Sequence, residues 1–442
     1  MQIAAMSMPN RSGDALIAAG ASASLRDHWR ICSFVLLLFV MAATFSAVRK
    51  DVTRGFDEVA HASYVAHLQK TGEVWPAFDD QRALDPVTFR FTGGLNYLNH
   101  PSPYYVLLAR LGPQLEGHPE AIVVHRLLNI VLVAIGLAAM MMIGLIAPLP
   151  RLSLYAYVVP LACIPVLVPL AGAINNDNLA FAGGGIATLA AWQLASTGSR
   201  ASLLAALAGV VMASWAKMTG LLLVGGLVGG VLVWTLWRGR FQAWWIVPIA
   251  IAGMLAVAPY VAFIVQYGSP APATAGQIAM IKMGAHVGGL DVAPRMSPGH
   301  FVVHFVASFV SEWMPVLEPR NALNYMALSI PVAAILVAFA GLVVSLKRMA
   351  RGDEGAIDIV VAAGALAFTV TFVIHIFFDY RYHVPYGWTS VLPRYYLPLA
   401  ALVPLAGLSL LAAIKQPRMH AVLIGFLIAS PVLFRLLGAP LG

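Results

Sequence analysis

Two neighbouring carboxylates, Asp57 and Glu58, lie in FDEVAHASYVAHL, directly after the first long apolar run of the chain. A carboxylate in such a place can act as a general base, because it can accept a proton from a hydroxyl group as that group attacks. The alternative is that the pair only begins a helix, since acidic residues in a first turn interact favourably with the helix dipole. The position of the pair, directly after an apolar run where the chain meets water, favours the interpretation as a general base.

Two basic residues stand where basic residues are uncommon. Lys217 separates two apolar runs in GVVMASWAKMTGLLLV, and an ionisable group in such a place is a functional candidate by default. Arg394 precedes Tyr395 in VLPRYYLP, and a guanidinium group can hold a phosphate through two parallel hydrogen bonds. The competing interpretations are that Lys217 extends to lipid headgroups and that the aromatic residues form an interfacial belt. A belt does not explain why Asp379, Arg381 and Arg394 share one side.

Polar side chains of three further segments could join such a site. His61 follows Asp57 by four residues and therefore lies on the same face of a helix, where it could orient the carboxylate or share a divalent cation with it. Asn175 and Asp177, in GAINNDNLAFAGG, either bind hydroxyl groups of a ligand or begin a helix. His100, in LNHPSPYYVLLARL, opens another amphipathic stretch.

The elements that position these residues are membrane helices. The chain has 442 residues, of which 60% are hydrophobic and only 10% charged, and its mean hydropathy is +0.81. A soluble domain carries about a quarter charged residues. The net charge of +8 is not gathered in one soluble segment, which argues against nucleic-acid binding. Cys32 and Cys163 both fall in apolar runs, which argues against a disulfide framework and a cysteine-based metal site.

Eleven apolar runs are candidate membrane spans. The first is expected to be a retained helix rather than a signal peptide, because it is long for a signal sequence and lacks a convincing cleavage site. The predicted spans are 31–48, 121–147, 153–173, 178–196, 202–218, 220–237, 244–266, 326–346, 357–378, 395–414 and 419–437.

The positions of Lys and Arg predict the orientation of these spans. Basic residues concentrate at alternate connections, and the positive-inside rule places those connections in the cytoplasm. This predicts a cytoplasmic tail, 1–30, and one transmembrane domain, 31–442, with the C-terminus outside. The basic residues concerned are Arg26, Arg30, Arg151, Arg200, Arg238, Arg240, Lys347, Arg348, Arg351, Lys415 and Arg418.

Two long segments then lie outside. The first covers 49–120. Within it, apolar residues at helical spacing predict a helix over 57–71 that lies along the membrane surface and has Gly72 as its C-cap. The second, 267–325, begins as a loop and predicts an amphipathic helix over 299–313.

The order of these features resembles the GT-C superfamily, the integral-membrane glycosyltransferases that take sugars from polyprenyl-phosphate carriers. A first span, an acidic pair, a short helix and a His-Pro-aromatic segment follow one another. An Asn-Asp turn, a lysine between two apolar runs and an Arg-Tyr-Tyr-Leu-Pro element come later. The resemblance covers the general layout and implies an all-α bundle of about eleven transmembrane helices with external juxtamembrane helices. The soluble C-terminal domain of larger members has no counterpart in the sequence.

The resemblance also implies an activity. A bacterial inner-membrane hexosyl- or pentosyltransferase would move a sugar, with inversion, from a polyprenyl-phosphate carrier to a glycan, lipid or protein outside the cytoplasm. Asp57 matches the acidic residue that serves as general base in the first external loop of the family, with Glu58 beside it. Arg126 is either a basic site position or the structural partner of an acidic residue. The carrier phosphate would be bound by residues that converge externally, namely Lys217 and Arg394, with His100, Asn175, Asp177, Tyr395 and Arg381. Some GT-C families use a divalent cation and others do not, so the metal requirement stays open.

The alternatives are a transporter, a flippase or a polymerase of lipid-linked glycans. A transporter should show inverted repeats and broken helices that meet at the membrane midplane. The sequence shows no repeat, and its candidate residues gather on one side. A polymerase would share the substrates, but it would not require an acidic pair after the first helix. Glycosyl transfer therefore accounts for more of the sequence.

Overall fold

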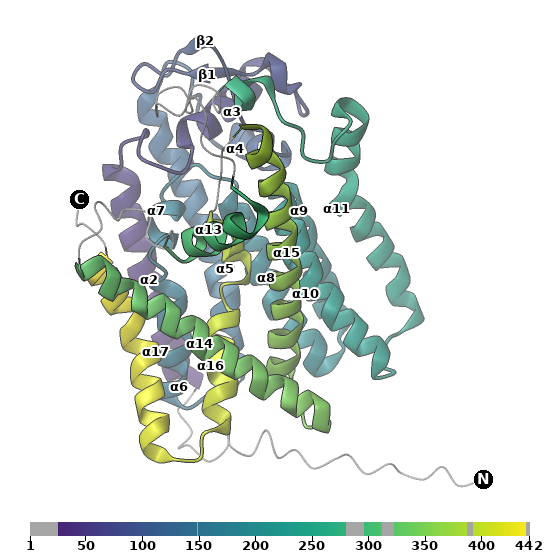
Figure 1. Cartoon of the computed structure of the whole chain (residues 1–442). Helices are drawn as coiled ribbons and strands as arrows, with labels where there is room; N and C mark the ends of the chain where they lie inside the picture. Colours follow the sequence, from purple (N-terminus) through teal and green to yellow (C-terminus); the bar gives the residue numbers. More distant parts are fainter. Residues whose placement is uncertain (1–24, 148, 280–295, 312–321, 387–391, 439–442) are drawn as a thin grey trace.

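The computed structural model describes residues 25–147, 149–279, 296–311, 322–386 and 392–438. Long helices run side by side in a bundle, and short helices with a small hairpin cover one end of it (Figure 1). The predicted all-α, polytopic fold is confirmed. The bundle consists of α2 (Leu25–Arg49), α5 (Ile122–Ile146), α6 (Arg151–Ala162), α7 (Leu167–Ala171), α8 (Asp177–Thr197), α9 (Arg200–Ala216), α10 (Met218–Trp237), α11 (Ile246–Tyr267) with η3 (Ala243–Trp245) before it, α14 (Ala322–Arg351), α15 (Ala356–Tyr386), η4 (Pro393–Leu399), α16 (Leu402–Ala413) and α17 (Pro417–Gly438).

Helices occur at all eleven predicted spans. By length and composition, seven helices in the described part of the chain can cross a membrane, or eight if the bent pair of η4 and α16 is counted as one span. The helices α9 and α17 are apolar but shorter over their described residues. The seven are Asp27–Arg49, Pro119–Ile146, Asp177–Thr197, Met218–Trp237, Ala243–Tyr267, Ile330–Arg351 and Ala356–Arg381.

Two of the predicted spans are interrupted, which corrects the expectation of continuous helices. The run 153–173 breaks between α6 and α7, where Pro165 removes a backbone donor and its ring clashes with the preceding turn. The run 395–414 bends by 56° between η4 and α16. Pro398 and Pro404 flank this bend, so the same cause applies.

The first helix shows how the bundle meets lipid. Phe34, Leu37, Met41 and Phe45 recur at helical spacing along α2 and are all exposed. The opposite face of α2 is buried, with Ala43 and Ala47 inaccessible. Large apolar side chains exposed along one face of a long helix fit a lipid environment, because lipid imposes no cost on them.

Three consecutive glycines make α8 the central helix. A side chain at Gly183 would clash with the backbone of α9 at Gly209, and one at Gly185 with the backbone of α5 at Gly136. One at Gly184 would clash with Pro398 in η4. Small residues let helices approach closely in lipid, and here they bring η4, which carries Arg394, against α8, which begins at Asp177.

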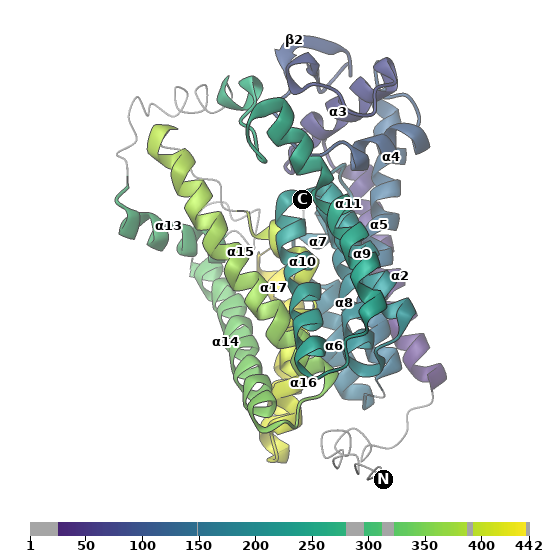
Figure 2. The ribbon, with the colours of Figure 1, turned by 90° about the vertical axis from the view of Figure 1, so that its right-hand side faces the viewer.

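The short elements at one end form the cap, residues 50–121. They are α3 (Glu58–Thr71), η1 (Phe78–Asp80), β1 (Arg82–Leu84), β2 (Phe91–Leu95), α4 (Pro103–Leu111) and η2 (Pro119–Ala121), and Figure 2 shows α3, α4 and β2 together at that end. The strands pair antiparallel, with Arg82 opposite Leu95 and Leu84 opposite Phe91. The sequence did not predict this hairpin.

The predicted helix over 57–71 is confirmed as α3. The backbone N–H of its C-cap, Gly72, bonds to Leu68 O at a φ of 73°, a left-handed conformation that glycine adopts without strain. Nearly every residue from Glu58 to Leu68 is buried, so α3 is enclosed by the cap instead of being amphipathic. The predicted helix over 299–313 corresponds to α13 (Pro298–Ser311), as far as the structure describes that segment.

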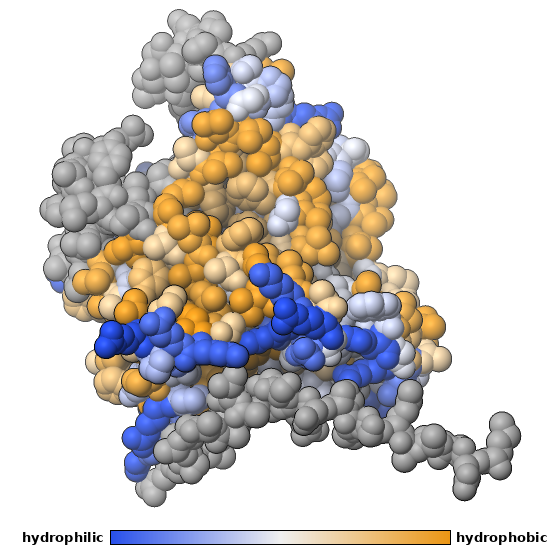
Figure 3. All heavy atoms as spheres, turned by 60° about the horizontal axis from the view of Figure 1, so that its bottom comes forward, coloured by the Kyte–Doolittle hydropathy of each residue, from blue (hydrophilic) through white to orange (hydrophobic). Residues whose placement is uncertain are grey.

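A hydrophilic band borders the apolar surface at the opposite end of the bundle (Figure 3). The helix ends at the predicted cytoplasmic connections, such as the start of α6 and the end of α10, lie at this end (Figure 1). Two ion pairs cross this end, from Arg151 to Asp27 and from Arg238 to Glu354. This grouping fits the alternation on which the orientation was predicted. Below, this end is called the basic end.

Candidate functional site

The loop that enters α3 holds three successive residues in the left-handed region. Gly55, Phe56 and Asp57 have φ values of 79°, 63° and 57°. For residues with a side chain such a conformation costs about 1–3 kcal/mol and persists where the surrounding structure enforces it, often at functional sites. Asp57 is the N-cap of α3, but its side chain makes no capping hydrogen bond. The carboxylate is therefore turned to other partners.

Glu58, the next residue, has its carboxylate sealed inside the protein. Arg126 donates from Nε to Oε1 at 2.7 Å and from Nη2 to Oε2 at 2.8 Å. Lys50 Nζ donates to Oε2 at 2.9 Å, and the backbone N–H of Ile174 donates to Oε1 at 2.9 Å. Each oxygen thus has two donors, and the side chain is 0% exposed. Arg126 is a structural partner of Glu58, which was one of the two predicted roles.

Arg394 connects Asp57 with a second carboxylate, that of Asp177. Its Nη2 donates to Asp57 Oδ2 at 2.8 Å, and its Nε lies 3.2 Å from Asp177 Oδ2. Lys217 Nζ donates to Asp177 Oδ1. These four side chains, here called the charge cluster, come from four separate segments and carry two negative and two positive charges. Lys217 and Arg394, which were predicted to converge, thus both lie against Asp177; that they bind a phosphate there stays a prediction.

The charge cluster runs from solvent into the protein. The Asp57 side chain is 42% exposed and that of Arg394 11%, whereas Asp177 is 2% exposed. Arg394 Nε and Asp177 Oδ2 are buried and lack a hydrogen-bond partner despite their proximity. Buried polar atoms are nearly always satisfied, so this end of the cluster retains donor and acceptor capacity that the described residues do not use.

Aromatic residues surround the two cations. Lys217 Nζ lies 3.5 Å from the centroid of the Tyr395 ring, and the Arg394 guanidinium lies 5.4 Å from that of Phe56. The Tyr97 hydroxyl donates to Asp57 Oδ1 at 2.9 Å. Lys217, which lies between α9 and α10 at the cap end, has its pKa lowered to about 8 by burial, although Asp177 opposes the shift.

His61 lies behind the strained turn. Asn175 Nδ2 donates to His61 Nε2 at 3.1 Å and to Phe56 O at 2.9 Å. An imidazole that accepts at Nε2 carries its proton at Nδ1 when neutral, and His61 Nδ1 lies 2.8 Å from the Tyr105 hydroxyl. Burial lowers the pKa of His61 well below its ordinary value, so the ring is neutral near pH 7. Asn175 also accepts from the Asp177 N–H at 2.8 Å, and it thereby ties the turn to the start of α8.

The remaining predicted residues divide into two groups. The His100 ring stacks on His61 at 5.9 Å between centroids and adjoins the cluster. Arg381 is exposed near the end of α15, and within the described residues it makes no hydrogen bond or ion pair with the charge cluster. Sequence reasoning missed Phe56 and Tyr97, although Tyr97 lies only three residues before His100 in the same aromatic segment.

The arrangement does not fit a divalent cation. The two carboxylates of the charge cluster are paired with Lys217 and Arg394, and both His61 nitrogens have hydrogen-bond partners. Within the described ranges no group of three His, Cys, Asp or Glu side chains could hold a metal ion. The shared cation suggested for Asp57 and His61 therefore has no support in this geometry.

Comparison with known proteins bears on the fold. No protein-family model matches the chain, and no curated protein matches it. The crystal structure of ArnT from Cupriavidus metallidurans in the apo state is similar, with a TM-score of 0.53 and 14% identity over 90% of this chain. The chain thus shares its overall fold with ArnT. It spans 62% of the ArnT chain.

A second crystal structure of ArnT from the same organism, bound to undecaprenyl phosphate, is also similar. The identity is 16%, and 77% of each chain is covered. The TM-score of 0.37 is too low for this superposition to carry an argument. At these identities the comparisons show the fold alone.

Proposed function

We propose that this protein is a membrane glycosyltransferase that moves a sugar, with inversion, from a polyprenyl-phosphate carrier to a glycan, lipid or protein acceptor. The observation that carries the proposal is the charge cluster. In a chain that shares its overall fold with ArnT, two carboxylates and two cations from four distant segments meet next to the cap. Undecaprenyl phosphate, which ArnT binds, belongs to the class of carrier proposed.

The two cations supply what a carrier phosphate needs. A sugar linked to polyprenyl phosphate is a phosphodiester with one negative charge, and cleavage of the bond to the sugar leaves a phosphomonoester with a second charge. Lys217 and Arg394 stabilise this developing charge, and because they do so more in the transition state than in the ground state, they speed the reaction. The buried position of Lys217 strengthens the effect, since little water screens it.

Asp57 is the proposed general base. It is the carboxylate of the cluster that solvent reaches, and one of its oxygens is oriented by Tyr97. Inversion requires the base to lie on the face of the sugar opposite the departing phosphate. When Arg394 turns to the phosphate, Asp57 loses its cationic partner and accepts the proton of the attacking hydroxyl. The Glu58 carboxylate, with all four donors in place, takes no part in this step.

Binding of undecaprenyl phosphate to the purified protein in detergent tests the proposal. Lys217→Met and Arg394→Met each remove a phosphate-binding charge and should weaken binding at least tenfold, since charge-assisted hydrogen bonds contribute about 1.5–3 kcal/mol. Lys70→Met is the matched control, because Lys70 is an exposed cap lysine paired with Glu116. Equal affinities in all three variants would refute the phosphate-binding role.

The proposed location is a bacterial inner membrane, with the cap outside and the basic end in the cytoplasm. Cysteines introduced at Val87, an exposed cap residue, and at Asp353, exposed at the basic end, test the orientation. An impermeant thiol reagent added to intact cells should label the cysteine at position 87 and not the one at 353. The reverse pattern would place the charge cluster in the cytoplasm and contradict the proposal.

A further inference from the structure

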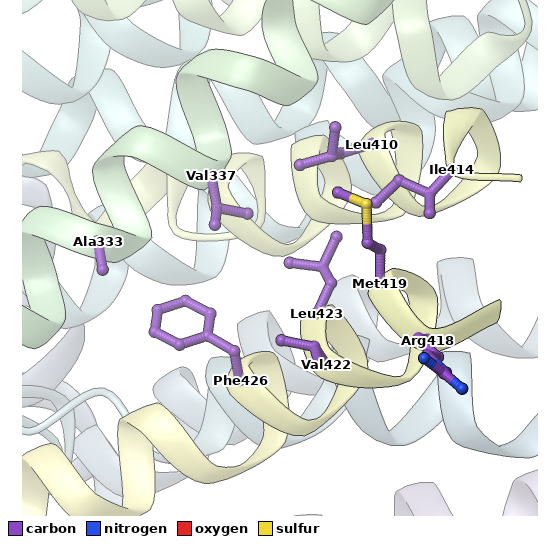
Figure 4. A pocket seen from close by; sticks show the side chains of 9 residues that line it. All are labelled: Ala333, Val337, Leu410, Ile414, Arg418, Met419, Val422, Leu423 and Phe426. Carbon is purple, nitrogen blue, oxygen red and sulfur yellow. The ribbon is translucent and has the colours of Figure 1, made fainter. Parts of the chain in front are cut away.

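An apolar groove lies on the bundle far from the charge cluster. It opens between α14, α16 and α17 and has a volume of about 490 Å³ (Figure 4). This volume falls within the range of small-molecule pockets, about 300–1,000 Å³. Val337, Leu410 and Phe426 line it, and Arg418 is the only charged residue among the described ones that line it.

The groove has a direction. Met419, Val422, Leu423 and Phe426 recur at the spacing of one helical face along α17. In Figure 4, Arg418 lies at one end with its guanidinium turned away from these side chains, and Ala333 and Phe426 lie at the other. The eight helical steps from Arg418 to Phe426 correspond to about 12 Å of helix. The groove is thus long and apolar, with a cation at its mouth.

Among the described residues, no acidic side chain pairs with the charge at the mouth. At the basic end Arg151, Arg238 and Arg348 pair with Asp27, Glu354 and Asp358. Arg418 and Lys415, which precedes it across the short connection, are both exposed. Within the described part of the chain neither of them forms an ion pair. A long apolar groove with Arg418 at its mouth, and with Lys415 next to its lining residue Ile414 in the sequence, matches one kind of molecule, an amphiphile with an anionic headgroup.

We propose that the groove binds an anionic phospholipid of the leaflet at the basic end, with an acyl chain along α17 and the phosphate at Arg418 and Lys415. Basic pockets between helices near a membrane surface bind such headgroups. The groove opens to the outside of the bundle, since Val422 is 73% exposed, so a lipid enters it from the bilayer without a conformational change. A polyprenyl-phosphate carrier is not the proposed occupant, because its phosphate would be bound at the opposite end of the bundle.

Native mass spectrometry of the full-length protein in detergent, with added phosphatidylglycerol or phosphatidylcholine, tests the site. Phosphatidylglycerol should bind more tightly than phosphatidylcholine. Each basic residue near an anionic lipid surface contributes about fivefold in affinity, so Lys415→Gln/Arg418→Gln should weaken phosphatidylglycerol binding by about 30-fold. Val422→Trp fills the groove from an exposed position and should weaken binding of both lipids. Arg351→Gln, an exposed basic residue at the same end outside the groove, is the control.

Three results would overturn the assignment. One is equal affinity for the two phospholipids, which would remove headgroup recognition. The second is an affinity for phosphatidylglycerol that the double variant and Val422→Trp leave unchanged, which would place the lipid elsewhere. The third is tighter binding of undecaprenyl phosphate than of phosphatidylglycerol, abolished by Val422→Trp, which would make the groove a carrier site.

Discussion

Asp57 and Glu58 are adjacent in sequence, and the fold gives them opposite surroundings. Glu58 is enclosed by Arg126, Lys50 and a backbone N–H, and each of its two carboxylate oxygens accepts two hydrogen bonds. Asp57 lies on a strained turn, is partly exposed, and has Arg394 as its cationic partner. The cause is the helix start: neighbouring residues point in directions about 100° apart, so only one of two can face the core.

The comparison shows how a site can be both stable and reactive. The buried Glu58 network anchors the start of α3 to α5 and to the end of α2, and this rigid base holds the turn in its left-handed conformation. The charge cluster on the other side keeps an unpartnered donor and acceptor. Under the proposed function, stability and chemistry fall to different carboxylates one residue apart.

Loss of Glu58 should have the largest effect on stability. Glu58→Gln leaves the buried Arg126 charge uncompensated and should destabilise the protein by about 3–5 kcal/mol, because breaking a buried ion pair costs that much. Thermal unfolding of the purified protein, followed by tryptophan fluorescence, measures the loss. Glu116→Gln is the matched control, since the exposed pair with Lys70 contributes at most about 1 kcal/mol. If Glu58→Gln and Glu116→Gln lowered the stability equally, the structural role that distinguishes Glu58 from Asp57 would be refuted.

Asp57→Asn should act on the reaction and leave the fold intact. It removes the proposed base and keeps the size of the side chain, so transfer should fall by a factor on the order of a hundred or more. The measurement is sugar transfer from a polyprenyl-phosphate donor, with protein yield and donor binding as readouts that stay near normal. Asp51→Asn, an exposed acidic residue of the same loop, should change neither. Near-normal transfer by Asp57→Asn, with none by a folded Glu58→Gln, would mean that the roles are reversed.

Arg394→Lys tests whether the charge cluster needs the planar guanidinium group or only a positive charge at this position. The substitution keeps the positive charge but loses the planar fork that reaches Asp57 and Asp177 together, so transfer should fall about tenfold. Arg381→Lys is the control, because Arg381 lies outside the cluster. If both variants keep full activity, charge alone suffices at position 394 and the fork is irrelevant.

The smallest expected effect concerns pH. Burial lowers the pKa of His61, so the unfolded chain takes up a proton below about pH 6.5 while the folded protein does not. Stability should therefore fall as the pH drops below 6.5, by up to about 1.4 kcal/mol per pH unit. His61→Gln should reduce this slope in unfolding temperatures measured at pH 7.5, 6.5 and 5.5. The exposed His118→Gln should not. An unchanged slope in His61→Gln would show that this ring is not held neutral.

Much of the fold follows from the order of residues along the chain. Hydropathy locates the helices, because a segment in lipid must satisfy its own backbone hydrogen bonds and therefore forms a helix. Gly72 marks the end of α3. The breaks at Pro165 and between η4 and α16 were missed because a proline in an apolar run either kinks or ends a helix, and the packing partners decide which. The hairpin of β1 and β2 was missed because strands of three and five residues carry little periodicity.

The site was harder to predict than the fold. The sequence identifies Lys217 and Arg394 as unusual, and their meeting was expected. It does not reveal that Arg126 pairs with Glu58 across 68 positions, or that Arg394 reaches Asp57 across 337. Any cation near the cap could meet either carboxylate, and only the close approach of α8 to η4 and α5 decides between them.

A structure of the wild-type protein with undecaprenyl phosphate, determined by electron cryomicroscopy, tests the central claim most directly. We expect the phosphate within hydrogen-bond distance of Lys217 Nζ and the Arg394 guanidinium, the pair between Arg394 and Asp57 opened, and the bonds between Glu58 and Arg126 unchanged. A phosphate bound away from the charge cluster, with Arg394 still on Asp57, would contradict the account.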